Sequence, residues 1–491
     1  MLAGTGSDVG KSIIATALCR IFLQDGYSPA PFKAQNMALN SFATPEGMEI
    51  GRAQAVQAEA AGLAPHTDMN PLLLKPNSEH TTQVVLNGKP IGNRSAYDYF
   101  RRERQGELRE QVCAAFDRLA EQYNPVVMEG AGSISEINLR DTDLVNMPMA
   151  RHADAAVVLV ADIDRGGVFA SVYGSIMLQK PEDRERIKGI IINKFRGDLR
   201  LFEQGRKMLE EICNVPVLGV VPMFSDIYIE EEDSVELTRK CTSMSEGKTN
   251  IAVVLLRHIS NFTDFARLER DERINLFYTS NVEDIQKADI VIIPGTKSTL
   301  DDLYELRRNG VAQAIVRAHR NGTTVLGICG GYQMMGQTVY DPEGVEGNIP
   351  QLPGLGLLPA TTTMKGDKVT QQVEFAFYDG KEWSRQECRG YEIHQGETIV
   401  DDKDALCLTA DGHHDGCRQG DHCMGTYIHG ILDNPQFIEY LLSTTKKYSD
   451  KTKTTHTNEM SMEDFKNQQY DKLAEHLRQY VDMNKLYEIL C

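Results

Sequence analysis

Short apolar runs recur along this chain of 491 residues, and each of them ends in glycine and polar residues. Residues 155–160, 190–192 and 290–293 consist only of Ala, Val, Leu and Ile. Strands that are apolar on both faces are typical of parallel sheets that helices cover on both sides. The sequence therefore predicts an α/β fold with doubly wound, mostly parallel sheets, and it places the ligand sites where the strands end.

Length and composition predict two such domains. A single hydrophobic core seldom grows beyond about 250–300 residues, so 491 residues exceed one domain. Ser, Thr, Lys and Gly interrupt the apolar pattern at residues 238–250, which we expect to be the linker. It separates a first domain, residues 1–237, from a second, residues 251–442. Residues 443–491 begin as a polar segment and are predicted to form a helix from Met462 to about Tyr480.

Charge and cysteine content argue against several classes of function. The chain has 70 acidic and 52 basic residues and a net charge of −18, which disfavours binding to nucleic acid. It contains no run of 18 apolar residues and no basic-then-apolar start, so we expect no membrane association and no export. The ten scattered cysteines fit free thiols in a reducing environment. The sequence therefore predicts a cytoplasmic protein without nucleic-acid or membrane partners.

Residues 4–12 are typical of a phosphate-binding loop, because they end in Gly-Lys-Ser and run directly into a buried helical pattern. In such a loop the backbone N–H groups wrap the phosphates, Lys11 reaches the outer phosphates and the Ser12 hydroxyl ligates Mg²⁺. Thr5 stands where the strict pattern has its first glycine, and the preceding strand is either very short or begins upstream of Met1. The residues predicted to bind the nucleotide are Gly4, Thr5, Gly10, Lys11, Ser12 and, from a later strand end, Asn193.

Acidic residues that follow other apolar runs are candidates for the magnesium site. Glu129 has Gly-Ala-Gly behind it, so its carboxylate can complete the metal shell that begins with Ser12. Asp162 and Asp164 follow another run and compete for this role. We favour Glu129 and leave the choice among the three carboxylates open. Asn193, at the end of a further run, is placed to bind an adenine edge through its amide.

The stretch Thr324–Gln333 predicts a nucleophile at a sharp turn between a strand and a helix. Such a turn lifts the sulfur of Cys329 out of the sheet, and the following helix favours the thiolate. The alternative is a buried structural cysteine, but that role does not need three glycines around it. A cysteine nucleophile needs a base, and His429 ends a later strand at the same sheet edge. Gly295, on the neighbouring strand, and Gly330 are predicted to donate N–H groups to an oxyanion hole.

Six segments of the sequence resemble the cobyric acid synthase family, and the resemblance covers nearly the whole chain. These segments are residues 32–41, 49–55, 70–76, 162–169, 193–198 and 294–299. The resemblance implies a dethiobiotin-synthetase-like ATPase domain of the P-loop type, followed by a class I-type glutamine amidotransferase domain. Many amidotransferases of that class carry a glutamate two residues after the histidine, where this chain has Ile431. Glu392 and Asp433 therefore stay open as groups that orient the histidine.

The same resemblance implies glutamine and a corrinoid as partners, and ATP and Mg²⁺ as cofactors. Cys329 would form a thioester that releases ammonia, with His429 as base, while the first domain phosphorylates carboxylates that ammonia then converts to amides. The implied substrate is adenosylcobyrinic acid a,c-diamide, amidated at side chains b, d, e and g. The a,c-diamide synthase of the same pathway, or another ATP-dependent amidotransferase, is the alternative, and a homo-oligomer stays open. The residues predicted to contact the corrinoid carboxylates are Lys33, Gln35, Asn36, Asn40 and Lys75.

Overall fold

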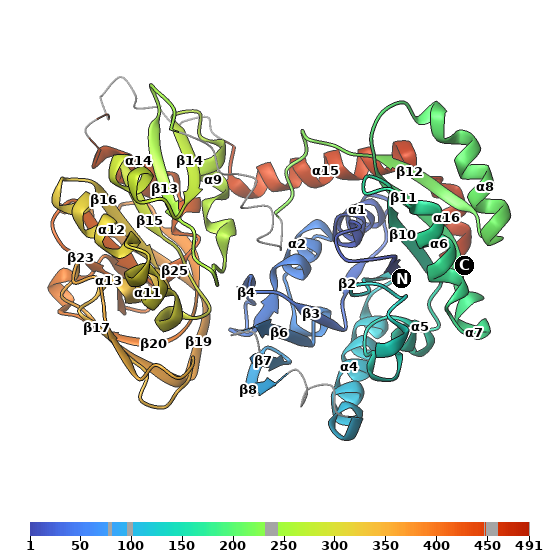
Figure 1. The fold of residues 1–491 in the computed structure, drawn as a ribbon, viewed down its shortest axis with the longest axis horizontal. Coiled ribbons are helices and arrows are strands. Elements are labelled where there is room, and N and C mark those ends of the chain that lie inside the picture. Colours follow the sequence, from blue (N-terminus) through green and yellow to red (C-terminus); the bar gives the residue numbers. More distant parts are fainter. Residues whose placement is uncertain (77–80, 96–101, 231–243, 446, 448–459, 491) are drawn as a thin grey trace.

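The structure is a computed structural model that describes residues 1–76, 81–95, 102–230, 244–445, 447 and 460–490. It has an α/β architecture with mostly parallel central sheets, as the sequence predicts, in two parts that lie side by side (Figure 1). Within the described ranges, no helix is both long enough and apolar enough to cross a membrane.

A parallel sheet with the order β1-β10-β11-β12 forms the centre of the first part. Its strands are β1 (Leu2–Gly4), β10 (Val157–Asp162), β11 (Ile187–Phe195) and β12 (Val217–Pro222). A parallel bridge between Leu2 and Glu129 extends it to β9 (Val126–Met128), which pairs with β2 (Ala30–Phe32). The strands are buried by helices that include α1 (Lys11–Gln24), α6 (Val168–Met177) and α8 (Glu203–Cys213). Cover on both faces explains the continuous apolar runs.

A smaller sheet of the first part, with the order β3-β6-β7-β8, lies on the side that faces the second part (Figure 1). Its strands are β3 (Gln35–Met37), β6 (Leu72–Pro76), β7 (Thr81–Leu86) and β8 (Lys89–Ser95). Around it lie β4 (Ser41–Ala43), β5 (Glu49–Gly51), α2 (Arg52–Ala60) and α4 (Arg102–Gln122). Strands this short, without continuous apolar runs, give little sequence signal, and the sequence did not predict this layer.

The second part has a central sheet with the order β14-β13-β15-β16-β24-β23, parallel except at β23. Its strands are β13 (Thr249–Val254), β14 (Ile274–Thr279), β15 (Ile290–Ile293), β16 (Thr324–Ile328), β23 (Cys417–Arg418) and β24 (Cys423–Thr426). Among its helices are α9 (Ala266–Arg270), α11 (Thr299–Arg308), α12 (Val311–Arg320), α13 (Gly330–Met335) and α14 (Pro435–Ser443). Since β13 begins at Thr249, the last two residues of the predicted linker belong to a strand; residues 238–243 lie outside the described ranges.

A second, mainly antiparallel sheet in this part was not predicted. Its order is β18-β17-β19-β20-β25, and β19 and β20 form its long central hairpin. These strands are β17 (Thr338–Tyr340), β18 (Gln351–Pro353), β19 (Thr361–Phe377), β20 (Cys388–Ile399) and β25 (Ile428–His429). Off this path, β21 (Cys407–Thr409) pairs with β19, and β22 (His414–Asp415) pairs with β21. Polar residues alternate with apolar ones in its long strands, because one face is exposed. Because β19 and β20 contain no continuous apolar run, the sequence did not predict these strands.

The chain returns to the first part at its end. Helix α15 spans Met462–Tyr480, the residues that the sequence predicts to be helical, and α16 spans Met483–Leu490. Figure 1 shows α15 running from the second part across α1 and β12 of the first. Leu473 and Leu477 are buried in the hydrophobic core of the first part. Helices α15 and α16 therefore pack into the core of the first part and do not form an independent tail.

Candidate active sites

The phosphate-binding loop connects β1 to α1 and borders a cavity of about 920 Å³. Gly10 has a φ of 95°, and a side chain there would overlap the Asn193 amide. A methyl group at Gly4 would lie 2.7 Å from Nζ of Lys11 and 2.8 Å from the carbonyl oxygen of Gly132. Neighbouring atoms therefore leave no room for a side chain at Gly4 or Gly10. This explains why the first glycine of the loop is Gly4, one residue earlier than in the strict pattern.

Lys11 borders this cavity and donates hydrogen bonds to the carbonyl oxygens of Gly6 (3.0 Å) and Gly132 (2.9 Å). Burial lowers the pKa of Lys11 to about 8, although the Glu129 carboxylate opposes the shift. A buried cation that rests on backbone carbonyl groups gains a stronger partner when a phosphate arrives. The loop therefore has the geometry and the charge of an anion site.

Three of the residues predicted to bind the nucleotide, Gly4, Thr5 and Asn193, contact other parts of the protein that hold the loop in place. Gly4 and Thr5 do not line the cavity; the Thr5 N–H donates to the carbonyl oxygen of Val160 at 3.0 Å and continues the sheet. Asn193 does line the cavity, but its Nδ2 donates to the carbonyl oxygen of Val9 at 2.9 Å. Its amide thus holds the loop, and its contact with adenine stays a prediction.

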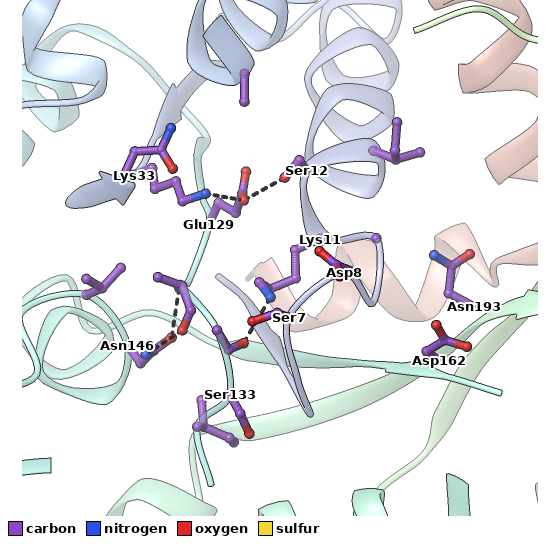
Figure 2. A pocket seen from close by; sticks show the side chains of 18 of the residues that line it. Ser7, Asp8, Lys11, Ser12, Lys33, Glu129, Ser133, Asn146, Asp162 and Asn193 are labelled. Carbon is purple, nitrogen blue, oxygen red and sulfur yellow. Dashed lines mark hydrogen bonds and ion pairs between the residues drawn. The ribbon is translucent and has the colours of Figure 1, made fainter. Parts of the chain in front are cut away.

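Glu129 lies between Ser12 and Lys33, as Figure 2 shows. Its Oε1 accepts hydrogen bonds from the Ser12 hydroxyl and from Nζ of Lys33, each at 2.8 Å, and its Oε2 accepts one from Gln57 at 2.6 Å. Burial would raise the pKa of Glu129, but the Lys33 ammonium and these hydrogen bonds lower it overall. A carboxylate beside a hydroxyl at the start of a helix supplies the hard oxygen ligands that Mg²⁺ prefers. Ser12 and Glu129 can hold the ion once the Lys33 ammonium no longer donates its hydrogen bond to Oε1 of Glu129.

The other two candidate carboxylates are paired with basic side chains. One oxygen of Asp162 lies 3.3 Å from Nζ of Lys194, and one oxygen of Asp164 lies 2.7 Å from Nε of Arg196. In Figure 2, Asp162 lies across the loop from Glu129. Of the three carboxylates, Glu129 is the one bonded to the loop serine.

The five residues predicted to contact the corrinoid are divided between two places. Lys33, Gln35 and Asn36 line the large cavity. Asn40 and Lys75 lie at the boundary between the two parts: the amide oxygen of Asn40 accepts a hydrogen bond from the backbone of the second part, and Lys75 lines a second cavity there. The contact of these five residues with the corrinoid stays a prediction.

Cys329 caps the N-terminus of α13 directly after β16. Its φ of 51° and ψ of −111° are rarely adopted by residues other than glycine, and such strain is typical of functional turns. A side chain at Gly331 would overlap the carbonyl oxygen of Ile293, and one at Gly330 would lie 2.6 Å from Cγ2 of Thr296. The glycines are therefore needed for the turn to approach the neighbouring strand β15.

His429 ends β25 and is 1% exposed. Its Nδ1 lies 2.7 Å from Oδ2 of Asp264, whose other oxygen accepts the Gly430 N–H at 3.0 Å. The carboxylate holds the proton on Nδ1, so Nε2 is the nitrogen that can take a proton from a thiol. Burial would lower the pKa of His429, but the Asp264 charge, its hydrogen bond and the Cys329 thiol raise it to about 10. The Tyr391 ring stacks on the imidazole, with 5.3 Å between centroids.

Asp264 is the carboxylate that orients His429, the role for which the sequence offered Glu392 and Asp433. Glu392 accepts a hydrogen bond from Gln371 at 2.7 Å, and Oδ1 of Asp433 is buried without a hydrogen-bond partner among the described residues. Asp264 escaped sequence analysis because it lies in a short 3-10 helix, Phe262–Phe265, 165 residues from the histidine. The available signal was a polar turn after the first strand of the second part.

A cavity of about 40 Å³ lies against Cys329 and His429. Its walls include Lys75 from the first part, and Lys297 and Lys368 from the second. Burial lowers the pKa of Lys297 to about 8 and that of Lys368 to about 7. A cavity of this size holds a few water molecules but no amino acid. Entry of a substrate therefore requires the walls to move.

The two glycines predicted to form an oxyanion hole lie close to the catalytic pair. A methyl group on Gly295 would be 3.1 Å from Cε1 of His429, and Gly330 directly follows Cys329 at the start of α13. Neither residue lines the small cavity. Their N–H groups as oxyanion donors stay a prediction.

Comparisons with known proteins agree with this division into two sites. A family model described as the CobQ/CobB/MinD/ParA nucleotide binding domain matches residues 1–235, and one described as the CobB/CobQ-like glutamine amidotransferase domain matches residues 250–437. Curated relatives named cobyric acid synthase, from Phocaeicola vulgatus and Bacteroides fragilis, are each 68% identical, and the alignments cover 100% of this chain and 98% of the relative. A relative of that name from Salmonella agona is 46% identical over the same shares.

Proposed function

The chain belongs to the cobyric acid synthase family, and on this premise we propose that it converts adenosylcobyrinic acid a,c-diamide into cobyric acid. ATP and glutamine would be consumed as side chains b, d, e and g are amidated. The observation that carries the proposal is that one chain holds a buried Cys329, His429 and Asp264 set as well as a phosphate-binding cavity. Residues 1–237 would act as the synthetase and residues 251–442 as the glutaminase.

The glutaminase reaction begins with transfer of the thiol proton of Cys329 to Nε2 of His429. The thiolate attacks the side-chain carbonyl carbon of glutamine, and the imidazolium returns the proton to the leaving nitrogen, so that ammonia departs and a thioester remains. Water then hydrolyses the thioester to glutamate. Asp264 stabilises the imidazolium through Nδ1, which fits the raised pKa of His429. The backbone N–H groups of Gly295 and Gly330 would stabilise the developing oxyanion.

The synthetase reaction gives the substrate carboxylate a leaving group. A carboxylate oxygen attacks the γ-phosphorus of ATP, ADP departs and an acyl phosphate forms. Ammonia attacks the acyl carbon, phosphate departs and an amide remains. Lys11 would bind the outer phosphates, and Lys33, Gln35 and Asn36 line the part of the same cavity where carboxylates of the corrinoid would bind.

Magnesium fits this site through the hydroxyl of Ser12 and the carboxylate of Glu129. When bound with ATP, the ion would neutralise phosphate charge. The protein's own contribution is to keep the buried Glu129 ionised through the Lys33 ammonium and through the hydrogen bond that Gln57 donates. Asp162 and Asp164 are the alternative carboxylates.

Mass spectrometry of the corrinoid tests the proposal. We would incubate adenosylcobyrinic acid a,c-diamide with ATP, Mg²⁺ and either glutamine or ammonium, using the wild type, Cys329→Ala and Lys11→Ala. The wild type should give four successive acid-to-amide mass changes with either nitrogen source. Cys329→Ala should amidate only with ammonium, and Lys11→Ala should amidate with neither while it still releases glutamate from glutamine.

A wild type that hydrolyses glutamine but leaves this corrinoid unchanged would contradict the cobyric acid assignment. Two amidations of cobyrinic acid itself would favour the a,c-diamide synthase instead. Amidation of Cys329→Ala with glutamine would contradict the role of the cysteine.

A further inference from the structure

Of the described residues, three lysines and one glutamate line the small cavity of the candidate glutaminase site. Glu49 neutralises two of these lysines, because it accepts hydrogen bonds from Lys75 (2.7 Å) and from Lys368 (2.5 Å). Lys297 differs from them. Within the described part of the chain it forms no ion pair, and its hydrogen bond to the amide oxygen of Gln395 is 3.5 Å long. The cavity therefore contains an ammonium group that no bonded carboxylate neutralises.

The glutamate of this cavity, Glu346, lies at the start of helix α11. Its Oε2 accepts hydrogen bonds from the N–H groups of Thr299 (2.7 Å) and Leu300 (3.3 Å), and its Oε1 lies 3.1 Å from the hydroxyl oxygen of Thr299. Burial raises the pKa of Glu346 to about 7, although the Lys297 ammonium and these hydrogen bonds oppose the shift. Since Lys297 precedes α11 by two residues, the start of one helix brings the two opposite charges together.

Lys297 and Glu346 influence each other through their charges, but no ion pair joins them among the described residues. Burial and the Lys75 ammonium lower the pKa of Lys297 to about 8. Buried charges without a bonded counter-ion are costly to keep. Each of the two would gain a charge-assisted hydrogen bond from a ligand that carries one anionic and one cationic group. An α-amino acid is such a ligand, because its carboxylate and its ammonium group are attached to the same carbon.

The two charged residues share their cavity with the candidate nucleophile. Cys329 and His429 line it together with Lys297 and Glu346, and the Cys329 sulfur lies close enough to raise the pKa of Lys297. Glutamine carries its α-carboxylate and α-ammonium groups a short aliphatic stem away from the amide that the sulfur attacks. A glutamine with its amide at Cys329 therefore places both charged groups in this cavity once the walls have moved apart.

We propose that Lys297 binds the α-carboxylate of glutamine and Glu346 its α-ammonium group, so that the two residues select a free α-amino acid as the amide donor. The inference rests on the proposed function, because it requires a glutaminase at Cys329, and it names the residues that determine its specificity. Its consequence concerns the product. Amide side chains of a corrinoid lack both charged groups, so the glutaminase does not hydrolyse the amides that the same chain forms.

The test measures ammonia release from three amides. They are glutamine, glutaramate, which lacks the α-ammonium group, and 4-aminobutanamide, which lacks the α-carboxylate. Lys297→Met and Glu346→Gln each remove one charge and keep the length of the side chain. The matched control is Lys287→Met, an exposed lysine of the second part whose Nζ lies 3.5 Å from Glu283. Lys368→Met removes a lysine of the same cavity that Glu49 already neutralises.

In the wild type, kcat/KM for glutamine should exceed that for each analogue by about 10- to 150-fold, the usual contribution of a hydrogen bond to a charged group. Lys297→Met should lower kcat/KM by that factor for glutamine and glutaramate and leave 4-aminobutanamide unchanged, since this amide has no α-carboxylate. Glu346→Gln should lower it for glutamine and 4-aminobutanamide and leave glutaramate unchanged. Lys287→Met should match the wild type, and Lys368→Met should change kcat/KM for all three amides by one common factor.

Three results would overturn the inference. The first needs no variant: a wild type that hydrolyses both analogues as efficiently as glutamine. The second is a Lys297→Met variant that loses the same factor with all three amides, since that is the behaviour of a residue with only a local structural role. The third is a Lys368→Met variant that spares 4-aminobutanamide alone, because Lys368 would then bind the α-carboxylate. A wild type that releases no ammonia from glutamine would contradict the proposed function itself.

Discussion

At the scale of single residues, the two sites differ in how their polar groups are held. Lys11 and the loop around it are shaped by glycines at which a side chain would collide with neighbouring atoms. His429 is instead held by a buried carboxylate, Asp264, and by the ring of Tyr391. Backbone shape therefore dominates the phosphate site, and buried electrostatics dominate the candidate base.

Replacing Asp264 by Asn tests that electrostatic role. The change removes the charge that raises the pKa of His429 and lets the wrong nitrogen carry the proton. We expect glutamate release to fall by about 10²- to 10⁴-fold, the usual contribution of a positioned general base, while ammonium-dependent amidation stays at the wild-type rate. Asp433→Asn is the matched control: burial raises the pKa of Asp433 to about 7, so an amide resembles its protonated form. Equal losses in the two variants would contradict the assignment of Asp264.

Replacing Gly10 by Ala tests the loop. A non-glycine residue at its φ of 95° costs about 1–3 kcal/mol, and the added methyl group would also displace the Asn193 amide. We expect ATP affinity, measured by calorimetry, to fall by about 5- to 150-fold, which is the fold-change that this cost corresponds to. Gly6→Ala is the control in the same loop, because the nearest atom to its methyl group would be 3.8 Å away. Unchanged ATP binding in Gly10→Ala would show that the loop does not bind phosphate.

At the scale of elements, the boundary between the two parts is held by buried charges. Glu49 in β5 accepts hydrogen bonds from Lys75 in β6 (2.7 Å) and Lys368 in β19 (2.5 Å). Burial would raise the pKa of Glu49, but the two ammonium groups lower it well below its usual range. A carboxyl group with a lowered pKa stabilises the fold above its ordinary pKa of about 4.3, and this contribution is lost as the pH falls. Acid should therefore loosen this boundary.

Glu49→Gln tests the boundary directly. The variant leaves two buried lysines without their anion, and breaking a buried pair from one side typically costs about 3–5 kcal/mol. We expect the free energy of unfolding in urea at pH 7 to fall by about that amount. The comparison variant is Glu397→Gln, whose partner Lys365 is 3.5 Å away at the surface; exposed pairs contribute about 0–1 kcal/mol. A Glu49→Gln variant as stable as Glu397→Gln would contradict this account.

At the scale of the whole molecule, the end of the chain completes the first part. Helix α15 packs along α1, and Lys466 on it pairs with Glu59 (3.3 Å) and Glu230 (3.0 Å) of the first part. At its start, the Phe465 ring lies 3.8 Å from the guanidinium of Arg270 in α9. The helix therefore contacts both parts, and the order of segments in space differs from their order in the chain.

Leu473→Ala in α15 should destabilise the first part. Removing this buried side chain typically costs about 2–5 kcal/mol, and Leu473 is 2% exposed. Trp383, the one tryptophan of the chain, lies in the second part, so its fluorescence follows that part while circular dichroism follows both. We expect the transition followed by circular dichroism to occur at a lower urea concentration in the variant, and the transition followed by fluorescence to stay at the urea concentration of the wild type. Leu490→Ala, 48% exposed in α16, should change neither. Equal shifts of both signals would show that the two parts unfold as one unit.

The sequence by itself determined the features that depend on neighbours in the chain. Residues 251–254 of β13 and 290–293 of β15 are apolar because these strands are covered on both faces, and the turns at Lys11 and Cys329 require glycines within a few residues of each. The partners of His429 were decided only by the tertiary structure. Asp264 and Asn261 are more than 160 residues away from it, and no local periodicity links them. The separation of Asn40 and Lys75 from Lys33 has the same cause, since packing between the two parts decides which cavity a polar loop residue reaches.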